Sequence, residues 1–174
     1  MTIIPAMTAP DPADPAGLRA AYGTFPTGVT AVCALRDGNP VGFAASSFVP
    51  VSLDPPLVSV CVQHSSTTWP LLVDRPRLGL SVLGDGQGAT CRRLASKTGD
   101  RFAGLDVTVT DDGAVLIPDA VAWLDCSIHE IVPAGDHDLV LLQVEAMRVR
   151  AGVPPLVFHA SGFHSLTALA APAA

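Results

Sequence analysis

The chain of 174 residues has a length typical of a single domain. Its formal net charge of −6 argues against a nucleic-acid-binding protein, because contacts with phosphates need clustered lysine and arginine. Charged residues make up only 15% of the chain, whereas about a quarter is usual for soluble domains. The apolar excess predicts an additional buried surface, most simply a subunit interface.

The proline-rich residues 1–16 predict a flexible N-terminal arm. No basic side chain precedes Arg19, so we expect no signal peptide, and no stretch reaches the roughly 20 apolar residues of a membrane span. Widely spaced cysteines without a C-x-x-C pair are expected to be buried free thiols: Cys33, Cys61, Cys91 and Cys126. These features favour a cytoplasmic protein that binds neither nucleic acid nor membrane.

The next segments alternate between strand and short-helix patterns. Runs rich in β-branched residues predict strands over residues 28–35, 40–48, 57–62 and 77–83. Helical spacing and end signals predict short helices over residues 17–23, 67–76 and 87–96. Asp37-Gly38 is a hairpin turn signal, and residues 96–117 give only weak signals.

The clearest strand signal covers residues 120–132. Its residues Ala122, Leu124, Cys126 and Ile128 alternate with more polar positions, which predicts one buried face. A second long strand is predicted over residues 138–150, after a turn at 135–137. Short connections favour a mainly antiparallel, closed or partly closed barrel with a few short helices over a doubly wound sheet. We therefore predict one domain over residues 17–167 and a frayed tail over 168–174.

Several familiar site patterns do not fit the chain. Residues 84–88, GDGQG, match neither the G-x-G-x-x-G nor the P-loop template and predict a loop. The five histidines lack zinc-ligand spacing, so no metal site is predicted. The G-x-S-x-G element of serine hydrolases is absent, although a triad defined by geometry alone stays open.

Two polar segments remain as candidate sites. Hydroxyl residues at 65–68 lie between a predicted strand end and a helix start, where hydroxyls and helix N–H groups bind anions. Simple N-capping, which needs only one of these hydroxyls, is the alternative. The second segment, Gly135-Asp136-His137, is either an ordinary turn or a functional one.

Six segments in chain order resemble the flavin reductase-like family, which has the FMN-binding split barrel fold. They are FPTGVTAV, GFAASSFVPVSLDPPLVSVCV, HSSTTWPLL, DRFAG, GDH and PLVFHASGF, and they span about Phe25 to Leu166. The resemblance implies a homodimeric NAD(P)H:flavin oxidoreductase. Such an enzyme reduces FMN or FAD with NADH or NADPH and supplies the reduced flavin to a partner monooxygenase.

The resemblance also implies site residues. Those expected at the flavin are Pro26, Thr27, Gly28, Val29, Ala44, Ala45, Ser46, Ser47, Phe48, Cys61, Val62, Gln63, Ser65, Ser66 and Thr68. Those expected at the nicotinamide are Gly135, Asp136, His137 and Phe163. His137 is expected to position the nicotinamide or to hydrogen-bond it, because the flavin itself carries the redox chemistry.

The small residues at 44–47 have a physical reason in this interpretation. The edge of a flat isoalloxazine ring carries donors and acceptors, which backbone groups reach only where side chains are small. Hydroxyl and N–H groups at residues 65–68 are expected to hold the phosphate. Arg92 and Arg93 are expected on a solvated helix face, with help at the phosphate as the alternative. Leu94 stands where many relatives have an aromatic residue, which leaves FMN or FAD open.

Two other functions stay open from the sequence. Residues 160–162, Ala-Ser-Gly, lack the basic side chains that many relatives carry there, so a flavin-binding module without turnover is one alternative. A split-barrel oxidase that retains its flavin is the other. Neither the choice between NADH and NADPH nor the identity of the partner oxygenase follows from the sequence.

Overall fold

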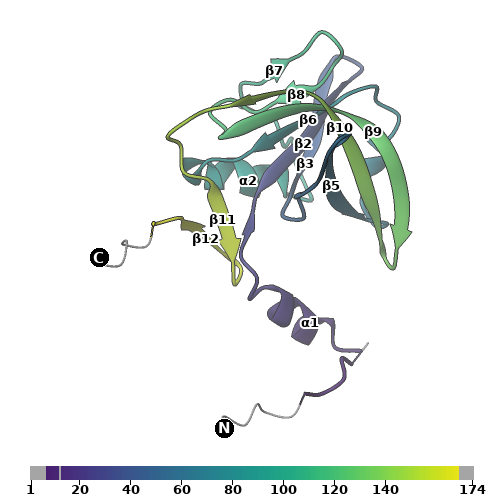
Figure 1. Cartoon of the computed structure of the whole chain (residues 1–174), viewed down its shortest axis with the longest axis vertical. Coiled ribbons are helices and arrows are strands. Elements are labelled where there is room, and N and C mark those ends of the chain that lie inside the picture. Colours follow the sequence, from purple (N-terminus) through teal and green to yellow (C-terminus); the bar gives the residue numbers. More distant parts are fainter. Residues whose placement is uncertain (1–6, 12, 169–174) are drawn as a thin grey trace.

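The computed structural model describes residues 7–11 and 13–168 (Figure 1). Part of the predicted arm and nearly all of the predicted tail therefore lie outside the described residues. Within them, the helical elements are α1 (Pro15–Tyr22), η1 (Trp69–Leu71), η2 (Asp85–Gln87) and α2 (Gly88–Leu94). The strands are β1 (Thr27–Gly28), β2 (Thr30–Arg36), β3 (Asn39–Ala45), β4 (Val49–Leu53), β5 (Pro56–Gln63), β6 (Leu78–Val82), β7 (Thr108–Val109), β8 (Val115–Leu116), β9 (Ala122–Ala134), β10 (His137–Val149), β11 (Leu156–His159) and β12 (Gly162–Ser165).

Seven strands form the main sheet in the order β3-β2-β6-β9-β10-β5-β4, and every neighbouring pair is antiparallel. Figure 1 shows this sheet curling round, with the long β9–β10 hairpin at one side. The sheet does not close, because β3 and β4 are its two edges. This confirms the predicted antiparallel split barrel with a few short helices.

Two groups of buried side chains stabilise the barrel. One fills its interior and includes Val60, Leu80 and Leu142, each with no exposed surface. The other packs α2 and β11 against the outside of the sheet and includes Leu94 and Leu156. Helix α1 buries none of its residues and lies away from the barrel in Figure 1. It begins at Pro15, two residues before the predicted start, because the Asp14 carboxylate caps it.

The predicted hairpin turns are present. Asp37 and Gly38 have φ values of 50° and 78° between β2 and β3, the positive values that a two-residue turn of this kind needs. Gly135 has φ of 68° in the turn between β9 and β10. Between β4 and β5 the chain turns at a cis Asp54–Pro55 bond, so β5 runs back beside β4.

The structure corrects several predicted elements. The helix expected over 67–76 is only the 3-10 turn η1. The Arg36 guanidinium from β2 donates a hydrogen bond to the Leu71 carbonyl oxygen at 3.0 Å, and Pro76 has no N–H with which to continue a helix. β4 was not predicted, and it contains Pro50, which a strand tolerates at a sheet edge. Residues 96–117, which gave only weak signals, contain the two-residue strands β7 and β8. The C-terminal segment PLVFHASGF forms the β11–β12 hairpin.

The prediction of four buried thiols is wrong for one of them. Cys33, Cys91 and Cys126 are buried, but Cys61 is exposed. Val60 and Val62 point into the barrel interior, so strand alternation directs the Cys61 side chain outward. Among the described residues, no helix is long and apolar enough to cross a membrane.

Candidate functional site

The segment of small residues at 44–47, which we call the ledge, begins where β3 ends. Gly42 just before it cannot be larger, because a Cβ there would clash with the Cys33 sulfur and the Val32 carbonyl oxygen. The Ser47 hydroxyl accepts a hydrogen bond from the Cys61 N–H at 2.9 Å and donates to the Cys61 carbonyl at 3.2 Å. Ser47 therefore ties the ledge to β5.

The hydroxyl residues at 65–68, which we call the hydroxyl segment, follow the end of β5. The N–H of Trp69, the first residue of η1, donates to the Ser66 hydroxyl at 3.1 Å, while the N-cap position itself is Thr68, whose side chain makes no capping bond. Thr68 is buried, with 8% of its surface exposed. The expected row of free helix N–H groups is absent from this part of the described chain, because η1 has only three residues.

Arg101 brings a positive charge to the hydroxyl segment. Its guanidinium donates to the Thr68 hydroxyl at 2.6 Å, to the Gly42 carbonyl at 3.0 Å and to the Ser96 carbonyl at 2.7 Å. None of the ion pairs between described residues involves Arg101 or the nearby Lys97. A half-buried cation held by neutral groups attracts an anion.

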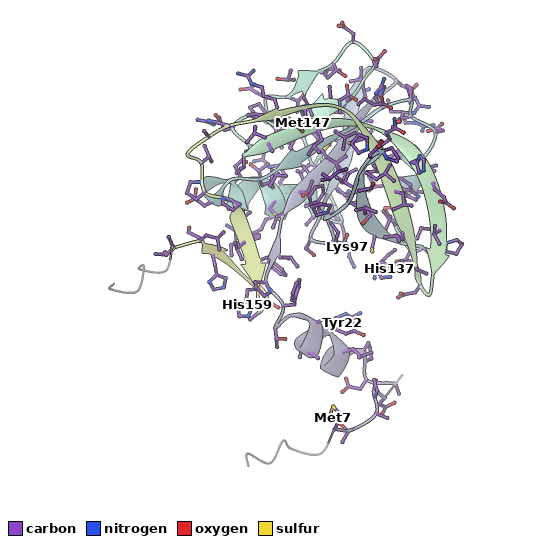
Figure 2. The ribbon with its side chains drawn as sticks, in the orientation of Figure 1. Met7, Tyr22, Lys97, His137, Met147 and His159 are labelled. Atoms are coloured by element: carbon purple, nitrogen blue, oxygen red, sulfur yellow. The ribbon has the colours of Figure 1, made fainter. Side chains whose placement is uncertain are left out.

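These segments enclose a cavity of about 650 Å³. The predicted site residues that line it are Ala44, Ala45, Ser46, Ser47, Cys61, Val62, Gln63, Ser65, Ser66, Thr68 and His137. The remaining lining residues are Phe43, Thr67, Leu94, Ala95, Lys97 and Arg101. Figure 2 shows Lys97 and His137 on the same side of the barrel.

His137 reaches the cavity from the first position of β10, where it pairs with Gln63 of β5. Its Nδ1 lies 2.6 Å from the Asp136 Oδ1. This hydrogen bond is the main reason that the pKa of the exposed Asp136 carboxyl is lowered, and the charge of His137 adds to it. The contact orients the imidazole ring at the cavity wall.

The structure does not bring the other predicted residues to the cavity: Pro26, Thr27, Gly28, Val29, Phe48, Gly135, Asp136 and Phe163. Thr27 and Gly28 pair with β11, and Phe48 packs against the barrel interior. Phe163 packs on Phe158 with 5.7 Å between ring centroids, and the Arg92 guanidinium lies 5.2 Å from its centroid.

Arg101 and Lys97 are the functional candidates that sequence reasoning missed. Arg101 lies in DRFAG, a segment that carried the resemblance but no assigned role. Because the chain is net acidic, hydroxyl and N–H groups were the groups expected at the phosphate. Only the fold reveals that Arg101, which is 33 residues from Thr68 and 59 from Gly42, meets both.

The cavity fits a flat ring that carries a phosphate. At the ledge, small side chains leave backbone groups accessible to a ring edge, and at the other end hydroxyls and two cations suit a dianion. A bound flavin supplies a ring that accepts a hydride from a nicotinamide. Of the described residues, no three His, Cys, Asp or Glu side chains cluster as metal ligands would.

Comparison with known proteins agrees with this geometry. Residues 22–167 match the flavin reductase like domain. A flavin reductase from Pseudomonas putida is 40% identical over 157 residues, which cover 90% of this chain and 92% of that protein. The reductase subunit of a flavin-dependent monooxygenase from Rhodococcus jostii is 36% identical over 84% of this chain and 75% of its own length.

A solved structure shows the same fold. It is an NADH:FAD oxidoreductase from Streptomyces globisporus in complex with NAD and FAD fragments, with a TM-score of 0.86 and 35% identity. The match covers 92% of this chain and 98% of that one. By its sequence, its split barrel and the chemistry of its cavity, the chain belongs to the flavin reductase-like family of oxidoreductases.

Proposed function

We propose that the protein reduces FMN or FAD with NADH or NADPH in the cavity between the ledge and the hydroxyl segment. This assignment rests on the uneven distribution of small and polar side chains around the cavity. Small residues line one part, while four hydroxyl residues, Lys97 and Arg101 line another. The flavin ring lies along the ledge, and its phosphate lies between Arg101 and the hydroxyl segment.

The nicotinamide docks beside His137, the one residue of the turn that reaches the cavity. His137 is a hydrogen-bonding group that orients the nicotinamide ring against the flavin. Asp136 orients His137 in turn, through the 2.6 Å contact between the two side chains. No protein nucleophile is needed, because the hydride passes between the two cofactors.

The reduced flavin then leaves for a separate monooxygenase. This role is supported by relatives that are named as reductase subunits of flavin-dependent monooxygenases. The cavity also supports it, since Cys61 and other residues around the ledge are exposed to solvent, which permits exchange. Four unpaired cysteines suit a reducing compartment, and we place the reaction in the cytoplasm.

We further propose that the active form is a homodimer. Large apolar side chains are exposed on the edge strand β4 and on β10, among them Leu53 at 97% and Met147 at 74%. In a dimer with its flavins near the interface, residues 26–28 and Phe163 of one subunit reach the flavin of the other, whereas Val29 stays in the core of its own subunit. Residues 26–28 and Phe163 do not line the cavity of their own chain, so a second subunit is the arrangement in which they can contact a flavin.

The direct test mixes the purified protein with each pairing of NADH or NADPH and FMN or FAD under anaerobic conditions. At least one pairing should lose the flavin absorbance at about 450 nm much faster than the same mixture without protein. If no pairing is accelerated, the proposed activity is wrong. Dialysis afterwards separates the alternatives, because a flavin that stays bound indicates an oxidase and a bound flavin that NADH cannot reduce indicates a binding module.

A further inference from the structure

The His64–Asp138 pair is adjacent in the chain to residues that line the cavity. His64 is the residue between β5 and the hydroxyl segment, and Asp138 is the second residue of β10. The His64 Nε2 lies 3.0 Å from the Asp138 Oδ1. Neither side chain lines the cavity, although Gln63, Ser65 and His137 beside them do.

A second bond joins the same two segments. The backbone N–H of His64 donates to the carbonyl oxygen of Asp136 at 2.9 Å. One residue therefore connects the start of the hydroxyl segment to both the turn and the strand that carry His137. At this point β5 and β10 have reached the end of their ladder, since Gln63↔His137 is their last pair.

The His64–Asp138 hydrogen bond lies where the backbone ladder between β5 and β10 ends, so it adds to the few bonds that connect the two segments there. Two bonds join His64 to this end of β10: the backbone bond to Asp136 lies beyond the last ladder pair, and the side-chain bond reaches back to Asp138, which pairs with Val62. Asp138 is partly shielded, with 23% of its side chain exposed, whereas 49% of the His64 side chain is exposed. A hydrogen bond to a partly shielded carboxylate is stronger than one between fully exposed groups.

We infer that His64 and Asp138 form a positioning pair, which sets the distance between the flavin phosphate segment and the nicotinamide turn. The pair acts on hydride transfer through His137 and does not touch either cofactor. This inference rests on the proposed function of the cavity. It assigns a role to two residues outside the cavity lining, one of which, His64, opens the HSSTTWPLL segment.

The test compares His64→Ala, Asp138→Ala and the double variant by single-turnover flavin reduction at saturating nicotinamide nucleotide. Each single variant should slow hydride transfer about fivefold, the change expected when one exposed hydrogen bond of ordinary net strength no longer positions His137. The double variant should be no slower than either single one, because both changes break the same contact. The flavin Kd and the Tm should stay close to those of the unaltered protein.

Two controls make the outcome specific. Asp138→Asn keeps an acceptor oxygen for His64 and should restore most of the rate. Arg150→Ala truncates another exposed pair, Arg150–Asp119 at 2.8 Å, and should leave the rate unchanged. Amide hydrogen exchange gives a readout without turnover: residues 64–68 and 135–138 should exchange faster in both alanine variants.

The inference is overturned if the alanine variants transfer hydride and exchange amides at the rates of the unaltered protein. It is also overturned if the two single effects add, or if the flavin Kd, the Tm and the rate change together as in general loosening. A different result tests the proposed function instead: if the unaltered protein reduces no flavin, the assignment of the cavity fails and the inference falls with it.

Discussion

Cys61 is the residue whose chemistry reports most simply on the cavity. It is exposed and lines the cavity, whereas the other three cysteines are buried. Burial raises the pKa of Cys33 and Cys126 to about 12 and also raises the pKa of Cys91, so these thiols are poor nucleophiles.

N-ethylmaleimide should therefore label Cys61 first. With FMN at about ten times its Kd, labelling should slow about tenfold, because only the flavin-free fraction exposes the thiol. Peptide mass spectrometry identifies the labelled residue, and Cys61→Ser serves as the control that loses the fast phase. Equal labelling rates with and without flavin would place the flavin away from Cys61.

Asp136 provides a pH-dependent test of the turn. Hydrogen bonding and charge from His137 lower the pKa of its carboxyl in the folded protein. A lowered pKa means that the contact contributes stability above the unfolded pKa and loses it as the pH falls through the folded pKa. Because Asp136 is exposed, we expect a local change in the turn and no loss of the fold.

Carbon-13 NMR of the Asp136 carboxyl should show a midpoint below about 3.9, the ordinary aspartate value. His137→Ala should raise that midpoint, since it removes the hydrogen-bond donor and the positive charge. His129→Ala, at another position on the β9–β10 hairpin, should leave the Asp136 midpoint unchanged. If the His137 variant titrates like the unaltered protein, the contact with Asp136 is absent in solution.

At the scale of elements, β6 depends on a glycine. A Cβ on Gly79 would clash with the carbonyl oxygen of Val115 in β8, so β8 packs directly against the backbone of β6. Gly79→Ala should destabilise the protein by about 1–3 kcal/mol, as overpacking of a filled core does. Urea unfolding should show a lower midpoint with an unchanged slope.

The matched control is Gly86→Ala in η2, where a Cβ meets nothing within 4 Å. That variant should unfold close to the midpoint of the unaltered protein. A Gly79→Ala variant as stable as the control would show that β8 does not cover β6 in solution.

The long strands were predictable from sequence because β2 and β5 are runs rich in apolar and β-branched residues, while β9 alternates around the buried Cys126. β2, β5, β9 and β10 all lie where the pattern predicts them. The short strands β7 and β8 carry no such signal, since two residues cannot show a period and their pairing depends on tertiary contacts. The helix at 67–76 was overpredicted because sequence does not show that Arg36 binds the carbonyl at its end.

In the candidate site too, residues that are continuous in sequence were predictable, and residues that only the fold brings together were not. The ledge and the hydroxyl segment are continuous in sequence, and most of their predicted residues line one cavity. Arg101 was missed because its contacts with Gly42 and Thr68 exist only in the fold. Phe163 was assigned to the nicotinamide by resemblance, but within one chain it packs against Phe158 and Arg92.

At the scale of the whole molecule, the proposed homodimer explains the apolar composition. Light scattering after gel filtration should give a mass close to twice 17.9 kDa at micromolar concentration. Leu53→Glu on the edge strand β4 should shift the mass toward the monomer, because it introduces a charge at a fully exposed apolar position. A monomeric mass for the unaltered protein at this concentration would contradict the dimer.

We propose above that the flavin phosphate lies between Arg101 and the hydroxyl segment. The most direct measurement compares the Kd of FMN with that of riboflavin, which lacks the phosphate, in the unaltered protein, in Arg101→Met and in the control Arg150→Met. The unaltered protein and the control should both prefer FMN. Arg101→Met should lose about tenfold or more of that preference, which corresponds to one charge-assisted hydrogen bond, while its riboflavin affinity stays the same. An unchanged preference for FMN in Arg101→Met would contradict the claim.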